Sequence, residues 1–442
     1  MTLEEHLAEW RAHVSRRHAI ADADVVELEE HLREQVADLA AAGLDDDEAF
    51  LIAVKRMGSL DDLSHEFAVE HSERLWKQLV RRTEPDADAG AHRRELAVVL
   101  WLAVAAAVVL RLDISVLRDD VAARLAPVLV LPFLGAYFGW KRRVPAAVLA
   151  VLAVAWAALV ALLAAYPFDD GGDTEVLATI HAPVVLWLLV GVAYVGGEWR
   201  SGRRRMDFIR FTGEWVVYYT LLALGGGTLL ALTLGVIGAV GGDPEPVVEY
   251  VLPMGAAGAV LVAAWLVEAK QSVIENIAPV LTKVFTPLTI AMLAVVLIAF
   301  AMHPDVIGVD RDLLVLMTAI LVLVLGLLLY AVSARDPLAP PGVFDGLQTA
   351  LIVVAIVVDG VLLVAMLSRI AEFGASANKL AALGLNLVLL VNLVWSTWLE
   401  LCFLRGRRPA SDLERWQTSY VPVYAVWAAV VVVTLPPSFG FA

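Results

Sequence analysis

The sequence predicts an all-α, polytopic membrane protein of about eleven transmembrane helices, with a cytoplasmic helical bundle at its N-terminus. Hydrophobic residues make up 60% of the 442 residues and charged residues 18%, whereas soluble domains average about 45–50% and about 25%. About eleven apolar runs follow one another along the chain, and a helical crossing needs about 20 apolar residues. We expect a bundle over 1–80, a polar linker over 81–94 and a membrane domain over 95–442.

Charge and cysteine content exclude some function classes. The formal net charge is −15, and most of the excess acid precedes His92. Nucleic-acid binding needs a basic face, so we expect no direct nucleic-acid partner. The one cysteine, Cys402, excludes a metal or redox site built on paired cysteines within the chain. Glu4, Glu5 and Glu9 stand where the apolar core of a signal peptide would begin, so the N-terminal segment is expected to stay in the cytoplasm.

Three amphipathic helices are expected in the N-terminal bundle. The first covers about 24–41, with apolar residues at helical spacing and acidic residues on the other face. Gly43 ends it, Asp45 can cap a second helix, and Gly58 ends that one in turn. Ser59 can cap a third helix reaching residue 79. The acidic surface is either a solvated face or a docking surface for a cytoplasmic regulator.

Short motifs in this bundle resemble a known class of domains. The motifs are Glu-Glu-His-Leu at 29–32, Gly-Leu-Asp-Asp-Asp-Glu-Ala at 43–49, Arg-Met-Gly-Ser at 56–59 and His-Glu-Phe at 65–67. They resemble the bacterial HAAS and permease-prefix class, which precedes multi-pass membrane segments and is often encoded near PadR-type transcription regulators. The resemblance implies a regulatory module and a regulator as partner.

The expected spans follow from the apolar runs. They cover 96–112, 121–139, 144–166, 176–195, 215–240, 247–267, 284–302, 313–332, 347–367, 380–404 and 420–435. The first span is the weakest because it is short and contains Arg111.

Loop charges predict the orientation, because basic residues accumulate on the cytoplasmic side. With the N-terminus inside, the cytoplasmic loops and span ends hold Lys141, Arg142, Arg143, Arg200, Arg203, Arg204, Arg205, Arg210, Arg405, Arg407, Arg408 and Arg415. The opposite loops and span ends hold Asp169, Asp170, Asp173, Asp243, Glu245, Glu249, Asp305 and Asp310. We therefore expect an inner-membrane protein whose residue 442 lies outside. Tryptophans at run ends fit an aromatic belt.

The membrane half resembles a second family. The motifs are Phe-Thr-Gly-Glu-Trp at 211–215, Val-Phe-Thr-Pro-Leu at 284–288, Arg-Ile-Ala-Glu-Phe-Gly at 369–374 and Tyr-Val-Pro-Val-Tyr at 420–424. They resemble a family of bacterial multi-pass membrane proteins catalogued as a domain of unknown function, the 4153 series. That family brings no established reaction. The segment 375–377 departs from the more polar run expected there.

Glycines and prolines suggest packing or gating positions. Gly225, Gly226 and Gly227 fit close helix packing, or a broken helix lining a cavity. Pro279 and Pro287 bracket the start of the seventh span, which fits either an interfacial, re-entrant stretch or a plain cytoplasmic loop.

Polar residues within two spans form the candidate site. Asp359 lies near the middle of the ninth span, with Gln348 on the same helical face. Ionisable groups inside a bilayer need a partner, a cavity or a function. In the tenth span the polar residues are Asn386, Asn392, Ser396 and Glu400, the last three at intervals of four. We expect a polar seam with Asp359 as proton acceptor and Asn392 as its hydrogen-bonding partner. The alternative is a protonated Asp359 that bonds a neighbouring helix.

Other motifs are weak. His181 in the fourth span is a further candidate, but a lone histidine more often forms a bond between helices. The sequence contains no HExxH, phosphate-loop, GxSxG or Cys/His metal motif, so no cofactor, metal or enzymatic reaction is predicted. Two functions remain: a transporter or permease regulated by its N-terminal bundle, with the substrate unassigned, or a membrane sensor that acts through a regulator.

Overall fold

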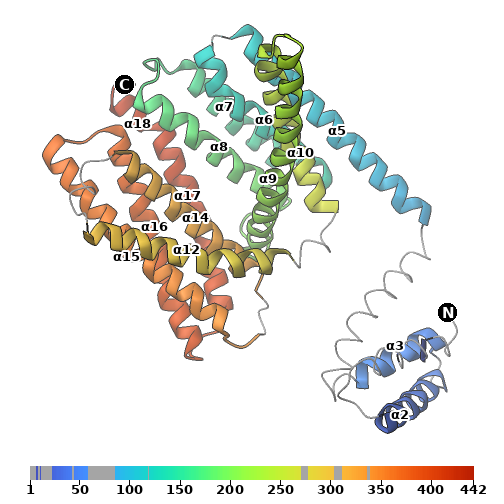
Figure 1. Ribbon diagram of the computed structural model, residues 1–442. Helices are drawn as coiled ribbons and strands as arrows, with labels where there is room; N and C mark the ends of the chain where they lie inside the picture. Colours follow the sequence, from blue (N-terminus) through green and yellow to red (C-terminus); the bar gives the residue numbers. More distant parts are fainter. Residues whose placement is uncertain are drawn as a thin grey trace. The chain divides into compact units, whose positions relative to one another are not determined.

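The computed structural model describes residues 6–7, 10, 22–41, 44–57, 85–117, 119–269, 277–302, 311–335 and 339–442 (Figure 1). All regular elements in these residues are helical, which confirms the predicted all-α class. The chain divides into two compact units, Met1–Glu95 and Leu96–Ala442. Residues 85–94, expected within the linker, are helical and begin the first membrane helix.

The N-terminal unit is built on two packed amphipathic helices, α2 (Asp22–Ala41) and α3 (Asp46–Met57). Its apolar core includes Leu32 and Val36 from α2 and Phe50 from α3, each almost fully buried. The side chain of Asp45 accepts a hydrogen bond of 2.7 Å from the backbone N–H of Asp47, so it caps α3 as predicted. The predicted third helix, 59–79, lies outside the described residues.

Eleven helices in the described residues are long and apolar enough to cross a membrane, as predicted. They are α5 (Pro85–Val116), α6 (Asp119–Lys141), α7 (Ala146–Ala165), α8 (Asp173–Tyr194), α9 (Gly202–Ala239), α10 (Leu252–Ala269), α12 (Ile277–Met302), α14 (Arg311–Ser333), α15 (Val343–Phe373), α16 (Ala377–Leu404) and α17 (Ser411–Val433). A π-helical turn, η1 (Val247–Val251), extends α10 at its start, and the short α18 (Leu435–Ser438) follows α17. The protein is therefore an integral membrane protein.

The membrane helices pack in two neighbourhoods of one unit (Figure 1). In the first, α8 packs on α6 and α9 packs on α10. In the second, α15 packs on α16 and α12, and α16 packs on α17. Contacts of α17 with α8 and of α14 with α9 join the two. Helices distant in the sequence are thus neighbours, and the largest buried apolar cluster lies in the second group.

The ends of several helices meet at one end of the membrane unit, which we name the arginine end. Glu268, at the end of α10, forms ion pairs of 2.8 Å with Lys141 and with Arg142, at the end of α6. Arg210, near the start of α9, donates to the backbone carbonyl of Ser333, the last residue of α14. These contacts bring the ends of α6, α10 and α14 and the start of α9 together.

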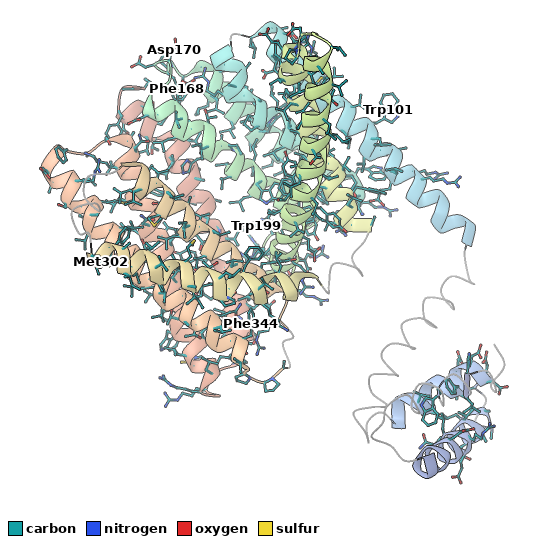
Figure 2. All side chains as sticks on the ribbon, viewed as in Figure 1. Trp101, Phe168, Asp170, Trp199, Met302 and Phe344 are labelled. Atoms are coloured by element: carbon teal, nitrogen blue, oxygen red, sulfur yellow. The ribbon has the colours of Figure 1, made fainter. Side chains whose placement is uncertain are left out.

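The connection between α7 and α8 and the C-terminal segment meet at the opposite end. The hydroxyl of Tyr166 donates to the carbonyl of Val433 at 2.9 Å. The backbone N–H groups of Asp169 and Thr174 donate to the carbonyls of Phe441 and Ala442 at 3.0 and 2.9 Å. Figure 2 labels Phe168 and Asp170 on this connection between α7 and α8. The end of α17 therefore lies opposite the arginine end, as expected if each helix crosses the bilayer.

Candidate functional site

Buried polar side chains lie along α15, α16 and α17, within an otherwise apolar core. Six of them, none more than 4% exposed, are Gln348, Asp359, Asn392, Ser396, Glu400 and Gln417. We call this set the polar track. Asn392, Ser396 and Glu400 recur every four residues, so they share one face of α16. That face is turned inward rather than toward lipid.

The middle of the polar track is a closed hydrogen-bond network between α16 and α17. Asn392 Nδ2 donates to Gln417 Oε1 at 3.0 Å, and Gln417 Nε2 donates to Ser396 Oγ at 2.8 Å. Ser396 Oγ in turn donates to the carbonyl of Asn392 at 2.7 Å. All three side chains are fully buried. The network satisfies polar groups that would otherwise be costly inside a bilayer.

Gln348 and Glu400 meet at the arginine end of the track. They line a cavity of about 20 Å³ together with Arg335, which has room for one water molecule. Arg335 Nε lies 2.8 Å from Asp345 Oδ1 in an ion pair, and its guanidinium lies over the ring of Phe403. The pair fixes the connection between α14 and α15 beside the cavity.

Asp359 lies deeper, at about the level of Asn392. Helices α15 and α16 are antiparallel. Gln348 of α15 lines the same cavity as Glu400 of α16, and Met366 Sδ of α15 lies 3.4 Å from the amide of Asn386 of α16. Asp359 lies between Gln348 and Met366 along α15, at a height that corresponds to Asn392 on α16. The amide of Asn392 pairs with Gln417 instead, and both Asp359 carboxyl oxygens are buried without a hydrogen-bond partner among the described residues. The α15 residues around it belong to the apolar core.

Asn386 lies beyond Asp359, further from the arginine end. Its side chain is fully buried, and its Nδ2 lies 3.4 Å from Thr318 Oγ1 of α14. Its Oδ1 has no hydrogen-bond partner among the described residues. Asn386 thus links α14, α15 and α16 and continues the row of buried polar groups past the level of Asp359.

The other predicted site residues lie elsewhere. His181 on α8 is half-buried, and its Nδ1 lies 2.8 Å from the carbonyl of Leu177 in its own helix. A Cβ added at Gly225, Gly226 or Gly227 would meet nothing within 4 Å, and α9 is unbroken there. These glycines therefore form neither a helix break nor a close contact within the described chain. Pro279 and Pro287 both fall within the continuous helix α12.

A second polar cavity lies at the arginine end, between α6, α8, α9 and α10. It has a volume of about 300 Å³ and is lined by Arg142, Tyr194, Val195, Arg204, Asp207, Arg210, Phe211, Glu214 and Val267. Glu214 is buried. The sequence marked these basic residues only as loop charges, because their convergence depends on contacts between distant helices.

Two residues of the hydrogen-bond networks, Gln417 and Thr318, were missed in the sequence. Gln417 precedes the expected start of the last span at residue 420, but α17 already begins at Ser411. Apolar residues flank Gln417 at helical spacing: Leu413 and Trp416 before it and Tyr420 after it. This spacing would have placed Gln417 on an inner face of a helix. Thr318 has no such signal, since threonines in membrane helices usually bond their own backbone.

Comparisons with known proteins give no match: no family model, no curated protein and no solved structure matches this chain. In the part of the chain that the structure describes, no three His, Cys, Asp or Glu side chains are grouped so that they could hold a metal ion. The polar track and its surroundings are therefore the features of the described chain that bear on function.

Proposed function

We propose that this integral membrane protein is a proton-linked transporter of the permease type, in the bacterial inner membrane, with the polar track as its proton path. The arginine end faces the cytoplasm in this proposal, because its connections carry the basic residues and such residues accumulate on the cytoplasmic side. In this proposal the N-terminal unit is a cytoplasmic module that regulates the transporter, as the HAAS and permease-prefix resemblance implies. The substrate is unassigned.

One observation carries the proposal: buried polar groups lead from the arginine end toward the middle of the bilayer. Glu400 and Gln348 line the outer cavity, and the Asn392 network follows. Eight residues of α16 separate Glu400 from Asn392, about 12 Å of helix rise, which is more than a third of a hydrocarbon core of about 30 Å. Polar groups this deep are rare without a function.

The chemistry of the track suits proton movement. Hydroxyl and amide groups both donate and accept hydrogen bonds, and Ser396 does both within the network. Asp359 stands at the inner end, and neither of its carboxyl oxygens has a hydrogen-bond partner in the described part of the chain. An unpaired carboxylate in mid-membrane costs about 2.5–3.5 kcal/mol on insertion scales. Taking up a proton removes that charge. Protonation and deprotonation of Asp359 therefore change which packing of the helices around it is favoured.

The first prediction tests this role with an isosteric variant. Inverted membrane vesicles containing the protein are given a proton gradient and a panel of polar solutes. We expect the wild type to accumulate at least one solute only with the gradient, and Asp359→Asn to slow that accumulation about tenfold or more, as loss of a proton-transfer group does. Glu372→Gln is the matched control, because Glu372 is an exposed acid on the same helix.

The outcome separates the two predicted functions. Full gradient-driven accumulation in Asp359→Asn, or no gradient-driven solute in the wild type, would contradict the proposal. The second result would favour a membrane sensor, which the separate compact N-terminal unit also supports. That alternative requires a cytoplasmic regulator of the PadR type as partner. Cross-linking the full chain in cells and recovering no regulator on the N-terminal unit would count against it.

A further inference from the structure

An apolar groove lies between α8, α9 and α17, apart from the polar track. Its volume is about 340 Å³, and its walls come from α8 between Val185 and Val195, from α17 between Val421 and Ala429, and from Phe208 of α9. Phe208 is held against α8 at Gly191, where an added Cβ would lie 2.7 Å from its ring. The small side chains of Ala425 and Ala429 leave space along α17.

The groove has the depth of one bilayer leaflet. The ten-residue interval from Val185 to Val195 corresponds to about 15 Å of helix rise, and half of a hydrocarbon core measures about 15 Å. Val195 and Trp199 mark its end at the arginine end of the membrane unit. Trp199, labelled in Figure 2, is 47% exposed, as expected of a tryptophan at the membrane interface. The groove therefore matches an acyl chain in depth and in polarity.

A cation that has no ion-pair partner among the described residues lies at the polar mouth of this groove. Arg205 lines the groove, and its Nε is buried without a hydrogen bond to any described residue. The neighbouring arginines differ: Arg204 pairs with Glu198 at 3.0 Å, and Arg210 donates to Ser333. No ion pair joins Arg205 to any described residue. A buried guanidinium nitrogen without a partner is costly, so the mouth favours an anion from outside the chain.

We propose that this groove binds one acyl chain of an anionic phospholipid, with the lipid phosphate group paired to Arg205. Arginine forms charge-assisted hydrogen bonds with phosphate oxygens, and basic pockets between membrane helices bind anionic head groups. The long apolar wall selects a lipid over free phosphate, because a soluble ion has no chain to fill the groove. This site is independent of proton transfer along the polar track.

The second prediction is that anionic lipid stabilises the protein through Arg205. Full-length protein in detergent is mixed with increasing concentrations of phosphatidylglycerol or of phosphatidylcholine with identical acyl chains. Binding of each lipid is measured from the rise in the melting temperature of the protein. We expect phosphatidylglycerol to bind more tightly, and Arg205→Gln to reduce that preference about fivefold, the contribution of one basic residue near the surface. Arg407→Gln is the matched control, an exposed arginine of another connection at the same end.

A second variant tests the acyl chain. Ala425→Leu narrows the groove without touching Arg205, and should weaken binding of both lipids. Val423→Leu, on the exposed side of the same helix, should leave binding unchanged. Inorganic phosphate alone should not raise the melting temperature. If Arg205→Gln keeps the full preference for phosphatidylglycerol, or phosphate stabilises as well as the lipid, the proposal is wrong.

Discussion

At the scale of single residues, the amides of Asn392 and Gln417 illustrate how a membrane core accommodates polar groups. Each amide uses both its oxygen and its nitrogen within the network that includes Ser396. In hydrocarbon there is no water to replace a lost partner. The network therefore fixes the rotation of α16 against α17, because turning either helix would leave these groups unpaired.

A third prediction measures this coupling. In a double-mutant cycle with Asn392→Ala and Gln417→Ala, we expect a coupling free energy between about 0.6 kcal/mol, the average for hydrogen bonds between membrane helices, and about 1.7 kcal/mol, the maximum. Reversible unfolding in detergent would supply the free energies. A control cycle pairs Asn392 with Thr434, whose hydroxyl bonds its own helix at Val430. Coupling no larger than that of the control would show that the network does not hold the two helices together.

The polar stripe of α16 was predictable from the sequence because spacing alone puts Asn392, Ser396 and Glu400 on one face. Their partners were not. The sequence suggested Asp359 as the partner of Asn392, but the observed partner is Gln417. Spacing determines which residues share a face of a helix, whereas the neighbour that meets this face depends on how the helices pack.

At the scale of helices, glycine serves opposite purposes in α16 and α9. Gly384 of α16 lies directly under the ring of Trp427, where an added Cβ would come within 1.9 Å. This contact lets α16 and α17 approach closely. Gly226 of α9 faces open space, where an added Cβ would meet nothing within 4 Å. The same residue type thus supports packing in one helix and has no packing partner in the described chain in the other.

A fourth prediction follows from this contrast. Gly384→Ala should lower stability by about 1–3 kcal/mol, as overpacking does. Gly226→Ala should leave stability unchanged or raise it by about 0.5–1 kcal/mol, because glycine weakens a helix relative to alanine. Thermal unfolding of both variants in the same detergent provides the comparison. Equal destabilisation by the two substitutions would contradict the packing described for α16 and α17.

The number of membrane helices was predictable from the sequence, but some of their ends were not. Apolar length marks only the part of a helix that lies in hydrocarbon. The fifth span was expected from residue 215, yet α9 begins at Gly202, where Ser201 accepts a bond from the N–H of Arg204. Polar turns at the interface extend the helix, and hydropathy does not detect them.

At the scale of the whole molecule, the fold brings together parts that lie far apart in the sequence. The Tyr166 hydroxyl bonds the carbonyl of Val433, and α17 packs on α8. Neither contact was predictable, since apolar helices of similar composition offer many alternative pairings. The alternation of connections between two ends was predictable, because every span must cross and clusters of basic residues mark three connections on the same side.

A fifth prediction tests the orientation. The substitutions Arg407→Cys and Asp170→Cys are made one at a time in the Cys402→Ser variant. The two introduced cysteines should react differently with thiol reagents in intact cells. A membrane-impermeant thiol reagent should label the cysteine at 170 and spare that at 407 until the cells are opened. A permeant reagent controls for reactivity at both positions. Labelling of position 407 from outside would reverse the orientation and with it the proposed direction of proton entry.

The free half of α9 has a mechanical consequence. Its apolar stretch, 215–239, has 25 residues, about 37 Å of helix rise, which exceeds a hydrocarbon core of about 30 Å. A helix too long for its membrane tilts, and the tilt varies with membrane thickness. Gly213 is fixed against Tyr330 at one end, while residues beyond Leu221 have almost no neighbours in the described chain. A thinner membrane would thus increase the tilt of α9 about its anchored end.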